Sequence, residues 1–217
     1  MNRTLQAAGN PESLIRIVLS RGEGIQAGDP RACPTPPNLV ILVRALVPVP
    51  ERTYREGTAA VVVDTRRNLP ASLDPRVKSN NLLNSILAAL DASRAGAPEG
   101  IMLNPAGDVA ESSNANVFLT LNGLLVTPCL DSGILSGITR ELVLQLACDH
   151  GVPAEERRVP RADLGRAQEV FLTSTSRELL PVVRLDGAPV GDGRPGPITR
   201  RLHSLYRRIT REVASGL

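Results

Sequence analysis

Lys78 is the first residue whose side chain could take part directly in a reaction. The chain has 217 residues with Lys+Arg 25 and Asp+Glu 22, and Lys78 is its only lysine, the other basic residues being arginines. A lysine amine can lose its proton and attack a carbonyl group, which a guanidinium cannot do. The surrounding sequence, DPRVKSNNLLNSILAAL, indicates a linker followed by a helix, where a lysine is often simply solvated. The arginine preference reflects composition, but the single amine makes Lys78 a candidate nucleophile.

A carboxylate and two hydroxyl-rich segments are the other candidates. Glu111 enters a run of small polar residues, VAESSNANVF, which would let a ligand approach closely or would form an ordinary polar loop. Gly137 and Thr139 open a helix whose first N–H groups and dipole favour an anion. Simple N-capping by Ser136 or Thr139 explains that pattern equally well. Four hydroxyl residues at 173–176 follow a buried strand and either hold a phosphate or cap the next segment.

Together these groups match what pyridoxal phosphate requires of a protein. An amine binds the aldehyde, a carboxylate keeps the pyridine nitrogen protonated, and convergent donors hold the phosphate.

The secondary-structure elements that must position these groups are helices and hairpins without a regular βαβ rhythm, which indicates the α+β class. The Asn122-Gly123 pair between apolar runs predicts a hairpin. Strands are expected at 14–20, 39–47, 59–63, 100–103, 116–121 and 169–172, and helices ending at residue 8, following Lys78, and at 139–149 and 200–213.

The chain from Ser20 to the C-terminus resembles the class IV (fold-type IV) pyridoxal-phosphate aminotransferases. This group includes branched-chain and D-amino-acid aminotransferases and aminodeoxychorismate lyase. The motifs that carry the resemblance are RGEG, TRRNLPASLDPRVKSNNLLNSILA, GDVAESSNANVFL, NGLLVTP, LDSGILSGITR, EVFLTSTSRELLPV and VGDGRPGPITRRL. The resemblance implies that Lys78 is the catalytic, Schiff-base lysine. It further implies a set of cofactor-binding residues: Lys78, Glu111 at the pyridine nitrogen, Leu135 on the ring, Gly137, Ile138 and Thr139 at the phosphate, and Ser174 and Thr175 in a second phosphate loop.

The activity implied by the resemblance is transamination between an amino acid and a 2-oxo acid, with pyridoxal 5'-phosphate as cofactor and a homodimer as the assembly. Freed Lys78 would then move the substrate Cα proton. Two alternatives stay open: an aminodeoxychorismate lyase, which eliminates pyruvate, and a truncated relative without catalysis. Leu83 stands where branched-chain enzymes carry a tyrosine, and leucine there is typical of D-amino-acid aminotransferases and of the lyases.

The domain organisation expected from the resemblance is most of the large domain plus the C-terminal part of the small one. Residues 1–66 are expected to be a remnant of the small N-terminal α/β domain, 67–75 the interdomain linker, and 76–217 the large cofactor-binding domain. The family's chain begins with a longer segment whose arginine grips the cofactor phosphate. Nothing before Leu5 resembles that segment, so we expect either a start codon placed too late or a truncated relative.

The composition excludes several other classes of protein. With 42% hydrophobic and 22% charged residues the chain is globular. It has no Trp, two Tyr and two Phe, too few aromatic residues to stack nucleic-acid bases. No apolar run approaches the roughly 20 residues of a spanning helix. Three cysteines without a CxxC motif fit a reducing compartment, and two distant histidines give no support for a metal site. We therefore expect a cytoplasmic protein without nucleic-acid, membrane or metal partners.

Overall fold

The computed structural model describes residues 1–26 and 28–215, and the side chains of the last helix up to residue 213. The chain divides into two compact units, Met1–Pro48 and Val49–Leu217. This division falls earlier than the predicted boundary at 66, because the third strand, β3 (Thr58–Val62), hydrogen-bonds within the large sheet of the second unit. The predicted linker at 67–75 is a stretch without helix or strand inside the second unit. That the first unit is a small-domain remnant stays a prediction.

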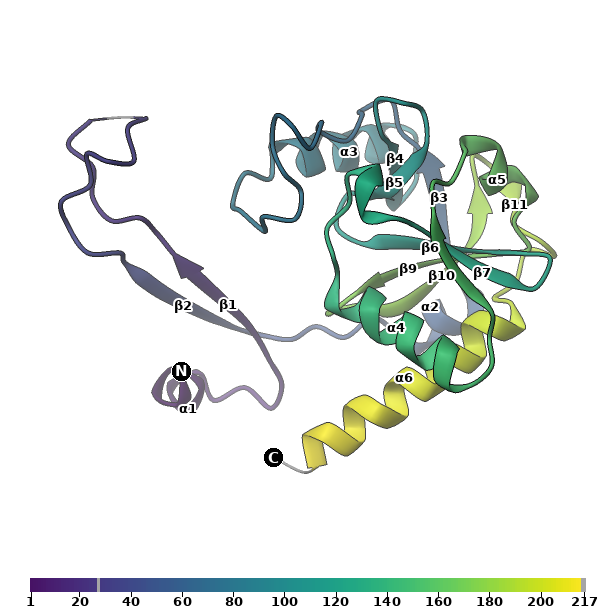
Figure 1. Ribbon diagram of the computed structural model, residues 1–217. Coiled ribbons are helices and arrows are strands. Elements are labelled where there is room, and N and C mark those ends of the chain that lie inside the picture. Colours follow the sequence, from purple (N-terminus) through teal and green to yellow (C-terminus); the bar gives the residue numbers. More distant parts are fainter. Residues whose placement is uncertain (27, 216–217) are drawn as a thin grey trace. The chain divides into compact units, whose positions relative to one another are not determined.

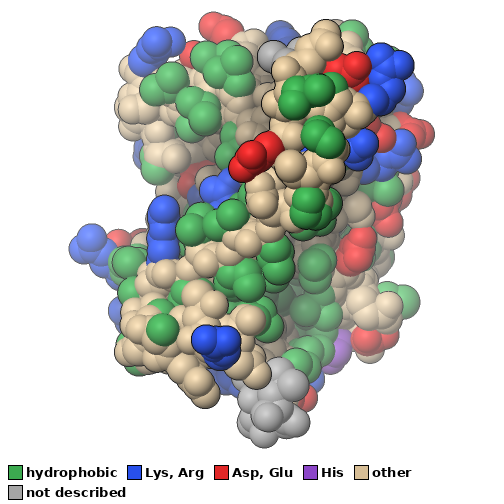
Figure 2. Space-filling model, turned by 90° about the vertical axis from the view of Figure 1, so that its left-hand side faces the viewer, with side chains coloured by type: hydrophobic (Ala, Val, Ile, Leu, Met, Phe, Trp, Pro, Cys, Tyr) green, Lys and Arg blue, Asp and Glu red, His purple; other side chains and the backbone are tan. Residues whose placement is uncertain are grey.

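The first unit consists of a short helix and a hairpin. Helix α1 (Asn2–Ala8) ends at Gly9, which has a φ of 61° and so adopts the left-handed conformation that glycine reaches without steric cost. Strand β1 (Ser13–Leu19) pairs antiparallel with β2 (Leu39–Ala45), and this confirms the two predicted strands. Hydrophobic side chains of the hairpin, including Ile17 and Leu19, are exposed, and hydrophobic atoms are spread over the face that Figure 2 shows.

The second unit is built on a nine-stranded mixed sheet (Figure 1). Its order is β11-β10-β3-β4-β5-β6-β7-β8, and β9 pairs with both β10 and β6. Strands β10, β3, β4, β5, β6 and β9 therefore form a closed ring of backbone pairings, as in a small barrel. Besides β3, the strands are β4 (Glu99–Leu103), β5 (Val109–Ser112), β6 (Asn116–Leu121), β7 (Leu124–Pro128), β8 (Ala154–Arg157), β9 (Glu169–Ser174), β10 (Glu178–Leu185) and β11 (Ala188–Pro189).

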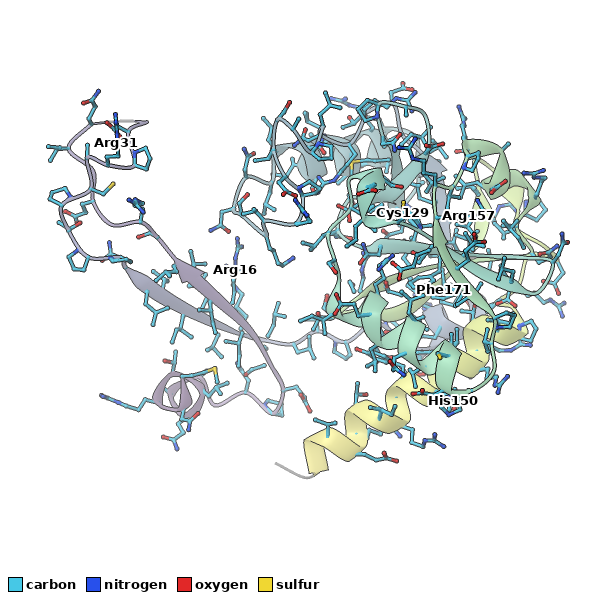
Figure 3. All side chains as sticks on the ribbon, in the orientation of Figure 1. Arg16, Arg31, Cys129, His150, Arg157 and Phe171 are labelled. Atoms are coloured by element: carbon cyan, nitrogen blue, oxygen red, sulfur yellow. The ribbon has the colours of Figure 1, made fainter. Side chains whose placement is uncertain are left out.

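Both faces of β6 and β9 are covered, so these strands are hydrophobic on both sides. Val117 and Leu172 belong to one apolar cluster, whereas the alternate residues Phe118 and Phe171 belong to another. The two phenylalanine rings stack with centroids 4.9 Å apart and pack against α4 (Ile138–Asp149) and α6 (Pro197–Ser215). Phe171 is marked in Figure 3, and Figure 1 shows α4 and α6 side by side along this face. This packing holds α4 against the sheet.

Helix α3 (Leu83–Arg94) confirms the helix predicted after Lys78, but only its small residues face the core. Ala88 and Ala92 are buried against β4, where a side-chain carbon added at Gly100 would lie 2.9 Å from the carbonyl oxygen of Ala88. The row of larger apolar side chains is exposed. That row consists of Leu82, Leu83, Ile86, Leu87 and Leu90. The remaining helices are α2 (Glu51–Glu56), α5 (Arg161–Arg166) and the 3-10 helix η1 (Leu130–Ser132).

The Asn122-Gly123 hairpin is confirmed between β6 and β7. Both residues have positive φ, 50° and 82°, as a tight hairpin turn matched to the twist of its strands requires. The strands predicted at 59–63, 100–103, 116–121 and 169–172 and the helices at 139–149 and 200–213 are also confirmed, with small shifts at their ends. Among the described helices, none is both long and apolar enough to cross a membrane.

Candidate active site

The register of three strands brings polar residues together at one end of the ring. Glu111 of β5 pairs with Asn116 of β6, and Asn116 pairs in turn with Thr173 of β9. Side chains of directly paired residues lie on the same face of a sheet, and all three are buried. The Thr173 hydroxyl has no hydrogen-bond partner among the described residues, which is unusual for a buried polar atom. This end of the ring is thus polar, and one of its buried hydroxyl groups lacks a hydrogen-bond partner among the described residues.

Glu111 is the charged centre of this row. Its Oε1 lies 2.9 Å from Nη2 of Arg67, and its Oε2 accepts hydrogen bonds from the Leu135 N–H at 3.0 Å and the Asn116 amide at 3.3 Å. Burial raises the pKa of the Glu111 carboxyl, while the Arg67 guanidinium, the Leu135 N–H and the Lys78 ammonium lower it. The site therefore holds a carboxylate whose charge depends on its neighbours.

Arg67 is a site residue that the sequence analysis missed. Its side chain is only 12% exposed, and besides Glu111 it binds the Gly133 carbonyl oxygen at 3.2 Å and the Asn84 side-chain oxygen at 3.1 Å. It lies within the TRRNLP stretch, but nothing local distinguishes it from Arg66. Only the fold shows that Arg67 is the arginine that turns inward to the carboxylate.

The start of α4 presents free backbone donors next to Asn116. Gly137 is the residue before the helix, and no side chain caps its first turn. The alternative of capping by Ser136 or Thr139 is therefore wrong, and the Ser136 hydroxyl instead donates to Glu141 at 2.5 Å. Ile138 is exposed and Thr139 is buried. Unpaired N–H groups at a helix start bind anions well, so the arrangement suits a phosphate.

The absence of a side chain at Gly137 is required by Asn116. A methyl group at Gly137 would overlap the side-chain oxygen of Asn116. The side-chain nitrogen of Asn116 donates to the Leu135 carbonyl oxygen at 2.8 Å. We expect Gly137→Ala to lower the free energy of unfolding by about 1–3 kcal/mol, the usual cost of overpacking. Urea denaturation measures this loss. The matched control is Gly165→Ala in α5, where nothing lies within 4 Å, and equal effects of the two changes would contradict the account.

The second predicted phosphate loop is the turn between β9 and β10. Ser174 ends β9 half-buried, and Thr175 is exposed in the turn. The turn is closed by the Arg177 N–H, which donates to the Ser174 carbonyl oxygen at 3.3 Å. The Arg177 guanidinium ion-pairs with buried Glu99 and also binds Asn114. Because Ser174 follows Thr173 directly, this turn adjoins the polar row at Asn116.

Lys78 is exposed in the loop before α3, five residues ahead of the helix. Its ammonium is one of the charges that lower the pKa of the Glu111 carboxyl. The structure thus joins Glu111, Asn116 and Leu135 through shared hydrogen bonds, and Gly137 lies against the Asn116 side chain. The Leu135 side chain is half-buried, and its role against a ring stays a prediction.

The residues present fit pyridoxal phosphate. The orphaned Thr173 hydroxyl, the uncapped start of α4 and the hydroxyls of the β9–β10 turn suit an anion, and a buried carboxylate and a free amine suit its ring and its aldehyde. No cluster of His, Cys, Asp and Glu side chains that could hold a metal ion occurs within the described residues. These are the kinds of group that a phosphorylated cofactor with a carbonyl group requires.

Comparison with known proteins gives the family. The family model described as amino-transferase class IV matches residues 1–185. A putative branched-chain-amino-acid aminotransferase of Methanocaldococcus jannaschii is 36% identical over 206 residues, covering 95% of this chain and 70% of that protein. A D-alanine aminotransferase of Listeria monocytogenes is 39% identical over 166 residues, covering 76% of this chain and 56% of that protein.

A solved structure agrees with these sequence matches. The branched-chain aminotransferase of the thermophilic archaeon Thermoproteus uzoniensis, solved with norvaline, has a TM-score of 0.85 and 35% identity, covering 95% of this chain and 68% of that one. The chain belongs to the class IV aminotransferase family and has its fold-type IV architecture. It spans between about half and 70% of the length of the relatives named here.

Proposed function

We propose that the protein is a transaminase that uses pyridoxal 5'-phosphate and moves an amino group between an amino acid and a 2-oxo acid. The observation that carries the proposal is Glu111, a buried carboxylate fixed by Arg67 and Leu135 within electrostatic reach of the only lysine. When bound, the cofactor supplies a conjugated ring that accepts electrons from the substrate.

Lys78 and Glu111 have the reactive roles in this proposal. The Lys78 Nζ holds the cofactor covalently, and as a free amine it moves the proton at the substrate Cα. Glu111 holds a proton at the pyridine nitrogen through its carboxylate. Arg67 supports that role because its charge lowers the pKa of Glu111 against the effect of burial.

The other predicted residues hold the cofactor. Gly137, Ile138 and Thr139 offer the free N–H groups of the α4 start to the phosphate, with the dipole of the 12-residue helix behind them. Ser174 and Thr175 offer hydroxyls from the β9–β10 turn. Leu135 packs on the ring, beside the backbone groups that already fix Glu111 and Asn116.

The substrates we propose are a small amino acid and a 2-oxo acid, because the relatives named above are branched-chain and D-alanine aminotransferases. These relatives give no support to the lyase alternative. Free cysteines at 33, 129 and 148 fit the cytoplasmic location that we also propose.

The function is tested with the full chain and added pyridoxal phosphate. L-leucine, L-valine and D-alanine are each offered with 2-oxoglutarate, and the glutamate formed is measured. We expect glutamate from at least one pair, and the preferred donor identifies the subtype. Pyruvate released from aminodeoxychorismate without amino transfer would overturn the proposal in favour of a lyase. Cofactor binding without either reaction would establish a non-catalytic relative.

We further propose that the chain forms a homodimer through the exposed apolar row of α3. A contiguous exposed apolar patch marks an interaction surface, and this row flanks the loop that carries Lys78. We expect Leu87→Glu to convert a dimer to a monomer in sedimentation velocity, because the charge would have to be buried at the interface. Val213→Glu is the control, since Val213 is exposed on α6. A monomeric wild-type chain, or a dimeric Leu87→Glu variant, would contradict this assembly.

A further inference from the structure

The side chain of Arg177 joins two turns at the candidate active site. Arg177 lies in the turn between β9 and β10, and its side chain is 19% exposed. Its Nη1 ion-pairs with the carboxylate of Glu99, and its Nη2 donates to the side-chain oxygen of Asn114. Asn114 belongs to the turn between β5 and β6. One guanidinium group therefore contacts both turns.

Glu99, the first residue of β4, fixes the position of this guanidinium. Its side chain is 8% exposed, and a buried carboxylate of this kind requires partners that compensate its charge. One of its oxygens pairs with Arg177, and the other accepts a hydrogen bond from the Ser112 hydroxyl at 3.3 Å. Ser112 follows Glu111 directly in β5. Glu99 thus attaches Arg177 to the strand that carries the central carboxylate of the site.

The third nitrogen of the guanidinium group, Nε, contacts the second predicted phosphate loop. It donates to the Ser174 hydroxyl oxygen at 3.5 Å, and the Arg177 backbone N–H donates to the Ser174 carbonyl oxygen at 3.3 Å. A hydroxyl group has one donor and two acceptor sites. Because Arg177 occupies an acceptor site, the Ser174 O–H can still donate, and linked hydrogen bonds strengthen one another. This contact therefore favours Ser174 as a donor to an anion.

Arg177 is poorly placed to bind a phosphate directly. An arginine that binds phosphate commonly presents two parallel N–H groups to it. All three nitrogens of this guanidinium already have side-chain acceptors, on Glu99, Asn114 and Ser174. Its positive charge is compensated by the Glu99 carboxylate. Any effect of Arg177 on a ligand should therefore pass through the residues that it holds.

We propose that Arg177 is a positioning residue that holds the Ser174 hydroxyl and the β9–β10 turn against the β5–β6 hairpin, and so gives the site its preference for a phosphorylated ligand. This inference rests on the proposed function, because it takes the β9–β10 turn to be a phosphate loop. In that proposal the β5–β6 hairpin carries Glu111 at the ring, and the turn carries Ser174 at the phosphate. Arg177 sets the spacing between these two parts of the site.

The test compares the full-length wild-type chain with Arg177→Lys. A lysine there keeps a positive charge beside the buried Glu99 carboxylate, but one ammonium group cannot reach all three acceptors of the guanidinium. The probes are pyridoxamine 5'-phosphate and pyridoxamine, and titration calorimetry gives their dissociation constants. Neither probe carries an aldehyde, so the added lysine cannot bind it covalently.

We expect Arg177→Lys to weaken binding of the phosphorylated probe alone. Its dissociation constant should rise by about tenfold, as for the loss of one hydrogen bond to a charged group, and that of pyridoxamine should change by less than about twofold. A purely structural role of Arg177 would raise both constants by the same factor. Equal increases for the two probes, or no increase for pyridoxamine 5'-phosphate, would overturn the proposal.

A double-mutant cycle tests the route through Ser174. Ser174→Ala should also raise the dissociation constant of pyridoxamine 5'-phosphate, because it removes the hydroxyl that Arg177 holds. Adding Arg177→Lys to Ser174→Ala should then have a smaller effect than it has in the wild-type chain, since residues that act through one another are not additive. Full additivity of the two changes would overturn this route.

The matched control is Arg184→Lys, which adds the same second lysine elsewhere on β10. Arg184 is exposed near the far end of that strand, and its guanidinium donates to the Gly187 carbonyl oxygen at 2.6 Å. This variant should bind both probes as the wild-type chain does. Loss of the preference for the phosphorylated probe in Arg184→Lys would overturn the assignment to Arg177.

Amide hydrogen exchange of the ligand-free chain tests the contact between the two turns independently of the proposed function. Arg177→Lys should speed up exchange by about fivefold or more at residues 113–116 and at residues 174–178, because each turn loses a hydrogen bond. Unchanged exchange at either turn would overturn the proposal. A wild-type chain that binds neither probe would refute the proposed function, and the exchange data would still decide whether Arg177 joins the two turns.

Discussion

We expect the replacement of Lys78 by alanine to abolish the visible absorption band of the lysine-bound cofactor and to lower transamination by about 10⁴-fold or more, since we propose Lys78 as both the covalent anchor and the base. Lys78 is exposed and forms no part of the core, so the free energy of unfolding should change by less than about 0.5 kcal/mol. The absorption spectrum with added pyridoxal phosphate and the rate of glutamate formation measure the effect.

Lys78→Arg is the matched variant, because it keeps a positive charge near Glu111 and removes only the nucleophilic amine. We expect it to be as inactive as Lys78→Ala. Recovery of activity in the arginine variant would show that Lys78 acts through its charge. A Lys78→Ala chain that keeps the band and the rate would refute the proposed mechanism.

The second large effect is expected at Glu111. Glu111→Ala leaves the Arg67 guanidinium, the Leu135 N–H and the Asn116 amide without this acceptor in a buried site. Breaking one side of a buried ion pair costs about 3–5 kcal/mol of stability. It also removes the group that we propose holds the pyridine proton, so transamination should fall by about 10²-fold or more. Urea denaturation and steady-state rates measure the two losses.

The Glu111→Gln variant separates the effect of Glu111 on the free energy of unfolding from its effect on the rate of transamination. The amide keeps an acceptor for Leu135, so the loss of stability should be smaller than for alanine, while the loss of rate should remain.

The stability of the protein should also depend on pH through Glu111. Burial raises the pKa of the Glu111 carboxyl, so the contribution of this residue to the free energy of unfolding is complete below the ordinary pKa of about 4.3 and declines as pH rises through the raised pKa. The stability of the wild-type chain relative to Glu111→Gln should therefore decline as pH rises. The opposite trend would contradict the assigned direction of the pKa.

Much of the fold could be predicted from local patterns. The apolar run at 116–121, the Asn122-Gly123 turn and the apolar spacing of residues 139–149 each specify an element through its own sequence, and all three are confirmed. The closed ring could not be predicted, because it is closed by pairings between distant segments, β10 with β3 and β6 with β9, and no local pattern records long-range register. The division into compact units falls at residue 48, ahead of the predicted 66, for the same reason: β3 looks like a strand of either unit until its partners are known.

The site was predicted only in part. Lys78 and Glu111 were predicted from residue type and from family resemblance, and the Lys78 ammonium contributes to lowering the pKa of Glu111, while the roles of both residues stay predictions. Arg67, Asn116 and Thr173 were missed as site residues, because their roles depend on strand register and on one inward-facing side chain. Glu111 was expected in a loop or turn but lies on β5, where its pairing with Asn116 fixes it.

The most direct test of the central claim uses the fact that the chain has one lysine. The full-length chain is incubated with pyridoxal phosphate, reduced with borohydride and digested for peptide mass spectrometry. The only other amine is the N-terminal one at Met1, so the position of the label is unambiguous. We expect a single reduced pyridoxyl adduct on the peptide that contains Lys78 and none in Lys78→Arg. A label confined to Met1, or no label on the wild-type chain, would contradict the assignment of this site.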